Sequence, residues 1–411
     1  MSDLIRLRTS KTNISPIIQQ IEDRVEMHQA RLLAAYQKYG VSESHLRSST
    51  GYGYDDIGRE TLERIVADLF GGELALVRPN IVSGTHAIAA CLYGILRPDD
   101  EWIALTGRPY DTLFEIIGSP HDGTGSLADL GIHYHEIGLT NKNEVDWLAF
   151  QQRLSKKTKL VAIQRSRGYS NRPSFTIAEI ESMIERIRKI LPNVIVFVDN
   201  CYGEFVEDKE PLHVGADLIA GSLIKNLGGG LAKSGGYIVG RKSLVGLAAA
   251  RLVAPGIGLE GGATHGYLAD YYQGLFLAPH VVGEALKGMV FASALFEEEG
   301  YIVSPSYKDK RTDIIQQIQL GTAEKLITFC QAIQAASPID AHVRPEPSPM
   351  PGYKDPVIMA AGTFVQGASI ELSADGPLRE PYTVYLQGGL TYAHVKVALK
   401  QALKAMKSTR E

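Results

Sequence analysis

The strongest constraint on the fold is an alternation of short apolar runs and helical stretches between residues 58 and 240. Apolar runs of strand length lie at 74–77, 102–105, 132–137, 159–163, 194–198, 217–220 and 236–239. Stretches with the periodicity of helices separate several of them, at 58–70, 85–96, 110–117 and 176–190. Buried strands that alternate with helices form βαβ units around a mostly parallel sheet. We therefore expect an α/β protein whose large domain holds a mostly parallel seven-stranded sheet between helices.

The pattern changes on both sides of this block, which indicates further parts in the 411-residue chain. Before it, residues 1–49 contain a candidate helix, and we interpret them as an N-terminal helical segment. The large domain is expected at 50–278, and its last part is a glycine-rich break at 255–266. A long helix is expected from about 279 to 298. Further elements follow at 321–335, 357–373, 382–387 and from 392 onward, so we interpret 279–411 as a smaller α+β domain.

Composition argues against several classes of protein. The formal net charge is −4, whereas nucleic-acid-binding proteins usually carry a basic balance or patch. No uninterrupted apolar run reaches the roughly 18 residues of a membrane span, and residues 1–13 lack the apolar core of a signal peptide. The three cysteines form no C-x-x-C pair, and His133 and His135 have no evident third metal ligand. We therefore expect a cytoplasmic protein with no membrane or nucleic-acid partner and no metal.

An acid and a lysine follow two expected strands in the block 194–240. Asp199 ends the run 194–198, and Lys225 follows the run 217–220. Ligands of open α/β sheets bind outside the carboxyl ends of the strands, so both side chains would face one crevice. This pair suits pyridoxal 5'-phosphate, because a lysine amine can form a Schiff base with its aldehyde and a carboxylate can hold the pyridine nitrogen protonated. Taken singly, Asp199 fits a structural or magnesium-binding acid equally well, and Lys225 fits an exposed loop lysine better.

The same cofactor needs a phosphate site and a stacking surface, and the sequence offers candidates for both. Ser83, Gly84 and Thr85 follow a strand and open a helix, where free backbone N–H groups bind phosphate. Ser222 could add a hydroxyl, although a serine at a helix start is also an ordinary cap. Tyr110 lies at a strand-to-helix turn, where its ring could stack on the pyridine and its hydroxyl could move a proton. A core tyrosine is the alternative interpretation of Tyr110.

Three motifs resemble the Cys/Met-metabolism family of pyridoxal-phosphate enzymes, which includes cystathionine β- and γ-lyases, cystathionine γ-synthase and methionine γ-lyase. Residues 198–202 read VDNCY where the family has V-D-N-T-Y. Residues 215–226 are similar to its G-A-D-L…H-S-x-T-K-Y run, and residues 71–85 are similar to its G-G-E…S-G-M run. Two segments are most similar to a divergent branch labelled aluminium-resistance or methionine γ-lyase-like proteins: SLIKNLGGG at 222–230 and GYGYDDIGRETLE at 51–63.

The resemblance implies fold type I and a role for each matching residue. Lys225 would be the Schiff-base lysine and Asp199 the partner of the pyridinium nitrogen. Gly84, Thr85 and Ser222 would hold the phosphate, and Tyr110 would stack on the ring.

The chain also departs from the family pattern. In the family, a Y-x-R motif reaches the cofactor phosphate of a neighbouring subunit. Tyr52 matches the tyrosine but Tyr54 replaces the arginine, for which Arg59 is a substitute candidate. Ile224 replaces a threonine before the lysine. For the substrate carboxylate, the arginine nearest the expected strand at 382–390 is Arg379, with a surface arginine as the alternative.

The resemblance implies a carbon–sulfur lyase, which cleaves the carbon–sulfur bond of a sulfur-containing amino acid by β- or γ-elimination. Lys225 would act as the base and Tyr110 would protonate the leaving sulfur. The same cofactor also supports transamination, racemisation or aldol-type cleavage, and the departures leave open a weakly catalytic binding protein with a regulatory or metal-resistance role. The family habit implies a homo-oligomer, a dimer of dimers, with active sites shared between subunits.

Overall fold

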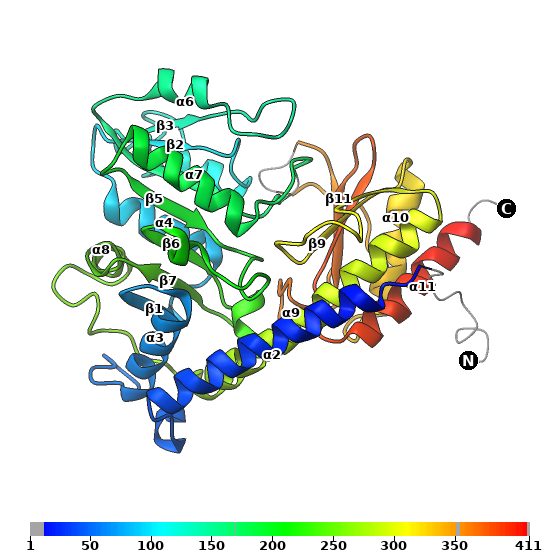
Figure 1. Cartoon of the computed structure of the whole chain (residues 1–411), viewed down its shortest axis with the longest axis horizontal. Coiled ribbons are helices and arrows are strands. Elements are labelled where there is room, and N and C mark those ends of the chain that lie inside the picture. The colour runs from blue at the N-terminus through cyan, green and yellow to red at the C-terminus, as the bar shows by residue number, and fades with distance from the viewer. Residues whose placement is uncertain (1–11, 169, 351–353, 409–411) are drawn as a thin grey trace.

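The computed structural model describes residues 12–168, 170–350 and 354–408, which form two lobes joined by long helices. The larger lobe contains a seven-stranded sheet, and the smaller one contains a five-stranded sheet. Helix α9 (Leu268–Glu298) passes from the larger lobe into the smaller one, and α2 (Ser15–Lys38) lies alongside it (Figure 1). The glycine at position 283 permits this contact, because a Cβ there would collide with the side chain of Val25.

The large sheet is mostly parallel and confirms the expected architecture. Its order is β1-β7-β6-β5-β4-β2-β3, and only β7 runs antiparallel to its neighbours. All seven expected strands are present: β1 (Leu74–Arg78), β2 (Glu101–Ala104), β3 (His133–Glu136), β4 (Thr158–Gln164), β5 (Ile195–Asp199), β6 (Leu218–Ser222) and β7 (Gly236–Gly240).

Alternate residues of the strands enter two separate hydrophobic cores, one on each face of the sheet. In β5, Val196 and Val198 join one core, whereas Ile195 and Phe197 join the other. This explains why the strands read as continuous apolar runs, since both faces of a strand are buried. The helices of this lobe are α3 (Ile57–Phe70), α4 (Gly84–Ile95), α5 (Thr112–Ile117), α6 (Trp147–Arg153), α7 (Ile177–Ile190) and α8 (Lys242–Leu252).

The smaller lobe is an antiparallel sheet covered by two helices, as expected for an α+β domain. Its strand order is β10-β11-β12-β9-β8, and helices α10 and α11 pack against each other beside it. Its elements are β8 (Ile302–Ser304), β9 (Ile315–Gln319), α10 (Ala323–Ala335), β10 (Val357–Ala360), β11 (Ser373–Pro377), β12 (Thr383–Gln387) and α11 (Tyr392–Ser408). Strands β8 and β9 were not expected from the sequence, and the expected run at 357–373 is strand only at its ends.

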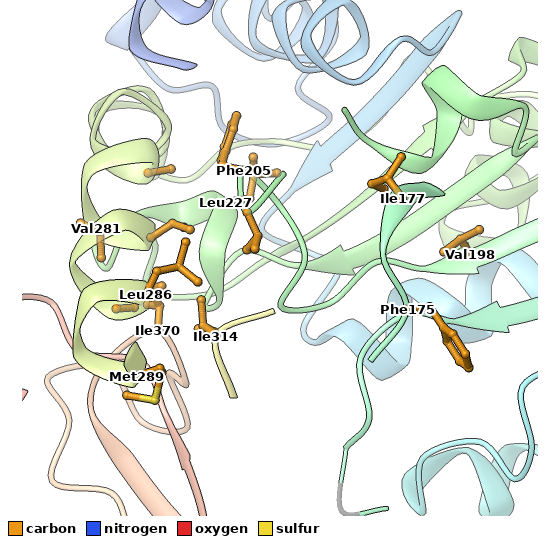
Figure 2. Close-up of a cluster of buried hydrophobic side chains, with 14 of the residues drawn as sticks. Phe175, Ile177, Val198, Phe205, Leu227, Val281, Leu286, Met289, Ile314 and Ile370 are labelled. Carbon is orange, nitrogen blue, oxygen red and sulfur yellow. The ribbon is translucent and has the colours of Figure 1, made fainter. Parts of the chain in front are cut away.

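Helix α9 begins at Leu268, earlier than the expected start near residue 279, so the expected domain boundary at 278/279 falls inside it. Pro279 lies within the helix, where it removes one backbone hydrogen bond. Burial against both lobes compensates for this loss. Figure 2 shows Val281, Leu286 and Met289 of α9 within a buried cluster that also holds labelled side chains from each lobe: Phe205, Leu227, Ile314 and Ile370.

By length and composition α9 could cross a membrane, but 72% of its most apolar window is buried inside the protein. A core helix of a folded domain meets the same criteria. The apolar character of α9 is therefore explained by its contacts with the two lobes.

Candidate active site

A cavity of about 300 Å³ lies where the carboxyl ends of the central strands meet the smaller lobe. From the large lobe, the ends of β4, β5 and β6 and the start of α4 line it. From the smaller lobe, β11 and β12 contribute Asp375, Tyr385 and Gln387. The cavity brings together most of the residues selected from the sequence: Ser83, Gly84, Thr85, Tyr110, Asp199, Ser222 and Lys225.

The turn before α4 forms one wall of this cavity. Ser83 is the N-cap of α4 and its Oγ accepts a hydrogen bond from the backbone N–H of His86 at 3.0 Å. The first N–H groups of a helix have no partner inside the helix, so those of this turn are suited to an anion. Gly84 allows a close approach to the end of β6, because a Cβ there would lie 3.3 Å from Cys201 Sγ and 3.4 Å from Ser222 Cβ.

Lys225 lies at the start of a short 3₁₀ helix directly after β6, with its amine inside the cavity. Its Nζ lies 4.0 Å from the centroid of the Tyr202 ring. Burial lowers the pKa of Lys225, but the nearby Cys201, Tyr202 and Asp199 raise it more, so the pKa lies above its usual value. Asp199 ends β5 on the same edge of the sheet, and its Oδ1 accepts a hydrogen bond from the backbone N–H of Cys201 at 3.1 Å.

A buried polar network fixes the loop beneath Lys225. The side-chain amide of Asn226 donates to the carbonyl oxygens of Tyr202 and Glu204, both at 3.0 Å. Tyr202 has a positive φ of 72°, a conformation that costs about 1–3 kcal/mol and needs such support. The hydroxyl of Tyr237 donates to Glu204 Oε1 at 2.6 Å. Burial raises the pKa of Glu204 to about 8, so this acid is protonated at neutral pH.

Tyr110 lies at the cavity edge and is partly exposed. Its backbone N–H donates to Gln164 Oε1 at 2.9 Å. Gly168, at φ +57°, allows a loop to pass beside the tyrosine, because a Cβ there would lie 3.2 Å from the Tyr110 ring. Sequence reasoning missed Gln164 and Tyr202. The rule that ligands bind at the carboxyl ends of strands could have found Gln164, which ends β4.

A second cavity of about 410 Å³, which we call the outer cavity, shares Tyr110, Gln164 and Tyr385 with the first. Arg379 lines this outer cavity and not the inner one. The Arg379 side chain is 57% exposed, and its Nη1 lies 3.5 Å from a carboxylate oxygen of Asp355. The outer cavity also contains Arg167, which sequence reasoning did not select.

Two residues that the resemblance connected with the phosphate of a neighbouring subunit lie outside the lining of both cavities. Tyr52 is 76% exposed and outside the lining of both cavities, and its ring stacks on Tyr54 with centroids 5.5 Å apart. The suggestion that Arg59 substitutes for the missing arginine is wrong. Its guanidinium is buried and donates to the carbonyl oxygens of Gly53, Gly262 and Glu260, so it is occupied in holding that loop.

Across residues 12–168, 170–350 and 354–408, no group of three or more His, Cys, Asp or Glu side chains is arranged to hold a metal ion. His135 instead lies 2.5 Å from a guanidinium nitrogen of Arg153.

Comparison with known proteins decides the family. The family model described as methionine gamma-lyase matches residues 4–407. The chain belongs to this family. The resemblance found in the sequence is thereby confirmed, because the match covers nearly the whole chain.

Individual relatives agree with this assignment. The chain is 56% identical to the uncharacterized protein YnbB of Bacillus subtilis over 397 residues, which cover 96% of this chain and 94% of the relative. The crystal structure of a putative cystathionine beta-lyase involved in aluminum resistance, from Listeria monocytogenes, is 53% identical with a TM-score of 0.95. That comparison covers 99% of this chain and 100% of the other.

A more distant structure supports the fold. The pyridoxal-5'-phosphate-dependent protein YhfS of Escherichia coli has a TM-score of 0.61 at 14% identity, covering 93% of this chain and 96% of the other. The chain has the fold of fold-type I pyridoxal-phosphate enzymes.

Proposed function

We propose that this member of the methionine gamma-lyase family is a pyridoxal-phosphate-dependent carbon–sulfur lyase that acts on a sulfur-containing amino acid. The observation that carries the proposal is that Lys225, Asp199 and the Ser83–Thr85 turn line one cavity. The family match supports a lyase, as does the similarity to the putative cystathionine beta-lyase of Listeria monocytogenes.

The residues present fit this cofactor. The turn at Ser83, Gly84 and Thr85 would hold the phosphate together with Ser222, and a Cβ at position 84 would narrow that space. Lys225 would bind the aldehyde carbon covalently, Asp199 would pair with the pyridine nitrogen, and Tyr110 would cover the ring. Bound pyridoxal phosphate supplies an electron sink for the amino acid attached to it.

The chain's own groups would perform the proton transfers. Lys225 Nζ removes the proton from Cα of the substrate, and the hydroxyl of Tyr110 protonates the sulfur as its bond to carbon breaks. One water is consumed in hydrolysing the nitrogen from the remaining carbon skeleton, and the products are a thiol, ammonia and a 2-oxo acid. Because neighbouring groups raise the pKa of Lys225, its amine must first release a proton before it can bind the aldehyde or act as a base.

The test is the visible absorbance spectrum of the purified protein beside Lys225→Ala. A yellow band in the wild type that is changed or lost in the variant supports the assignment of cofactor and lysine. A wild type that stays colourless after pyridoxal phosphate is added refutes it. Product analysis with cystathionine, cysteine and methionine then tests the reaction, and a transaminated or racemised product would contradict a lyase.

We also propose that the chain forms a homo-oligomer in which Tyr52 reaches a neighbouring subunit, with the dimer of dimers as the expected assembly. Exposed aromatic and apolar side chains support this idea, because Tyr52, Tyr54 and Ile57 lie close in sequence and are 48–76% exposed. A monomer in light scattering would contradict it. The three buried free cysteines suit a reducing cytoplasm, which cell fractionation would test.

A further inference from the structure

Arg167 is a buried cation on the wall of the outer cavity. It follows β4 in the chain, is 3% exposed, and reaches across to the smaller lobe. Its Nη1 donates to Gln317 Oε1 at 2.9 Å, to Ser304 Oγ at 3.0 Å and to the Ser304 carbonyl oxygen at 3.3 Å. All three acceptors are neutral, and its Nε is buried without a hydrogen-bond partner among the described residues. The positive charge is therefore desolvated without a direct ion pair to a described carboxylate.

Arg165, two residues earlier, shows how this fold neutralises a buried guanidinium. It is fully buried and lies 3.4 Å from Glu207 and 3.3 Å from Glu210. Among the described residues, no carboxylate forms such an ion pair with Arg167. Asp313 is the acid that acts on Arg167 electrostatically, and its oxygens accept hydrogen bonds from Ser166, Ser174 and Ile315.

A buried charge is costly unless it is paired, and breaking such a pair is strongly destabilising. An unpaired guanidinium that lines a cavity is therefore a site for an anion from outside the chain. Arg311 also bonds only to neutral acceptors, but it lines neither of the two cavities. The position of Arg167 on the cavity wall distinguishes it from Arg311.

Gln317 connects Arg167 to the inner cavity. It accepts from Arg167, and its Nε2 donates to Asn171 Oδ1 at 2.9 Å. The side chain of Gln317 also forms a hydrogen bond with Tyr385, which lines both cavities. Lys225 is on the inner side of this junction and the guanidinium of Arg167 is on the outer side. An amino acid held near Lys225 would thus have its carboxylate toward Arg167.

We propose that Arg167 binds the α-carboxylate of the amino-acid substrate, with Gln317 and Ser304 orienting its guanidinium. This inference rests on the proposed function and names the group that selects amino acids over simple amines. A guanidinium is well suited to this task, because its N–H groups match the two oxygens of a carboxylate. Arg379, at the exposed rim and beside Asp355, is not required for this binding.

The experiment is a spectral titration of the cofactor-loaded protein with L-alanine and with ethylamine, which lacks the carboxylate. The change in the visible band reports binding without turnover. In Arg167→Met, the dissociation constant for L-alanine is expected to rise about 30-fold or more, the range for losing one partner of a buried charge pair. That for ethylamine should change less than about twofold. Arg167→Lys keeps the positive charge but lacks the paired N–H donors of a guanidinium, so an intermediate loss of affinity for L-alanine is expected.

Arg379→Met is the matched control, with an expected change below about threefold for either ligand because its charge is exposed and screened. A comparable loss in Arg379→Met with none in Arg167→Met overturns the proposal and favours the rim arginine. Equal weakening of both ligands in Arg167→Met and Arg167→Lys also overturns it, because that pattern indicates a structural role. A missing cofactor band in the wild type refutes the proposed function itself, so the two failures are distinguishable.

Discussion

Replacing Arg165 by methionine tests the assignment of the buried ion-pair network that supports the active-site loop. Besides its two glutamates, the guanidinium donates to Asn200 Oδ1 at 2.9 Å and to Thr312 Oγ1 at 3.3 Å. Asn200 directly follows Asp199, and Thr312 belongs to the segment that leads into β9. The variant would leave Glu207 and Glu210 buried with much of their compensation removed, although Lys310 still contacts Glu207.

Removing one partner of a buried ion pair typically costs about 3–5 kcal/mol. Unfolding entropy near 60 °C is about 2.1 cal/mol/K per residue, or roughly 0.9 kcal/mol/K for this chain, so Tm should fall by about 3–6 °C. Burial already raises the pKa of Glu210, and losing Arg165 should raise it further. A carboxyl group whose pKa is raised by folding loses stability as pH rises, so the loss should be larger at pH 8 than at pH 5.

The measurement is thermal unfolding by calorimetry at both pH values, with Arg379→Met as the control. That arginine is half-exposed in its pair with Asp355, so its loss should cost about 1 kcal/mol or less. Adding Glu210→Gln to Arg165→Met should recover part of the stability, since it removes one uncompensated carboxylate. A melting temperature of Arg165→Met within about 1 °C of the wild type would refute the reasoning, as would equal losses in the two arginine variants.

Three further outcomes are expected from buried titratable groups and from the turn before α4. Because the folded pKa of Glu204 is about 8, the free energy of unfolding decreases as pH rises from about 4.5 to 8. Glu204→Gln should remove this pH dependence in denaturation curves, a difference of up to about 3 kcal/mol at pH 7. Burial lowers the pKa of His28 to about 4, so the free energy of unfolding decreases as pH falls from about 6.5 to 4. His28→Gln should reduce this loss of stability in acid, and an unchanged dependence of stability on pH would contradict the assignment. Gly84→Val should weaken pyridoxal phosphate binding about tenfold or more in an absorbance titration, while overpacking against Cys201 and Ser222 lowers Tm of the cofactor-free protein by only about 1–3 °C. Unchanged affinity would exclude a phosphate at this turn.

The sequence predicted the large lobe well because its signals are local. Each strand of the sheet is buried on both faces and reads as an apolar run, and glycines or caps such as Gly71 and Ser83 end or begin its helices. The smaller lobe was predicted less well. Strand β9 reads IQQIQ, in which Gln317 is buried through hydrogen bonds to Arg167 and Asn171, which are far away in sequence. No local sequence pattern predicts such a strand.

In the candidate site, too, local signals were predicted from the sequence and long-range contacts were not. Residues at strand ends or helix starts, such as Asp199 and Gly84, could be placed on one sheet edge by topology alone. Arg167 could not, because its significance depends on the acceptors Ser304 and Gln317 from the other lobe and on the lack of an ion pair with the described carboxylates. Arg379 was selected for its closeness in sequence to a strand, and the structure places it at the rim of the outer cavity.

Helix α9 constrains how a substrate can reach the site. Its 31 residues span about 46 Å and belong to both lobes, so no flexible linker separates them at this point. Hinge motions usually concentrate in a few loop or element-terminal residues. Although Pro279 removes one hydrogen bond from α9, the helix continues through it, and its neighbours Ala278 and Val281 are buried. The two lobes are thus expected to behave as one stiff frame, with substrate binding and product release controlled by the loops around the outer cavity. If α9 is stiff, a substrate reaches Lys225 when the loops move, and movement of one lobe away from the other contributes little.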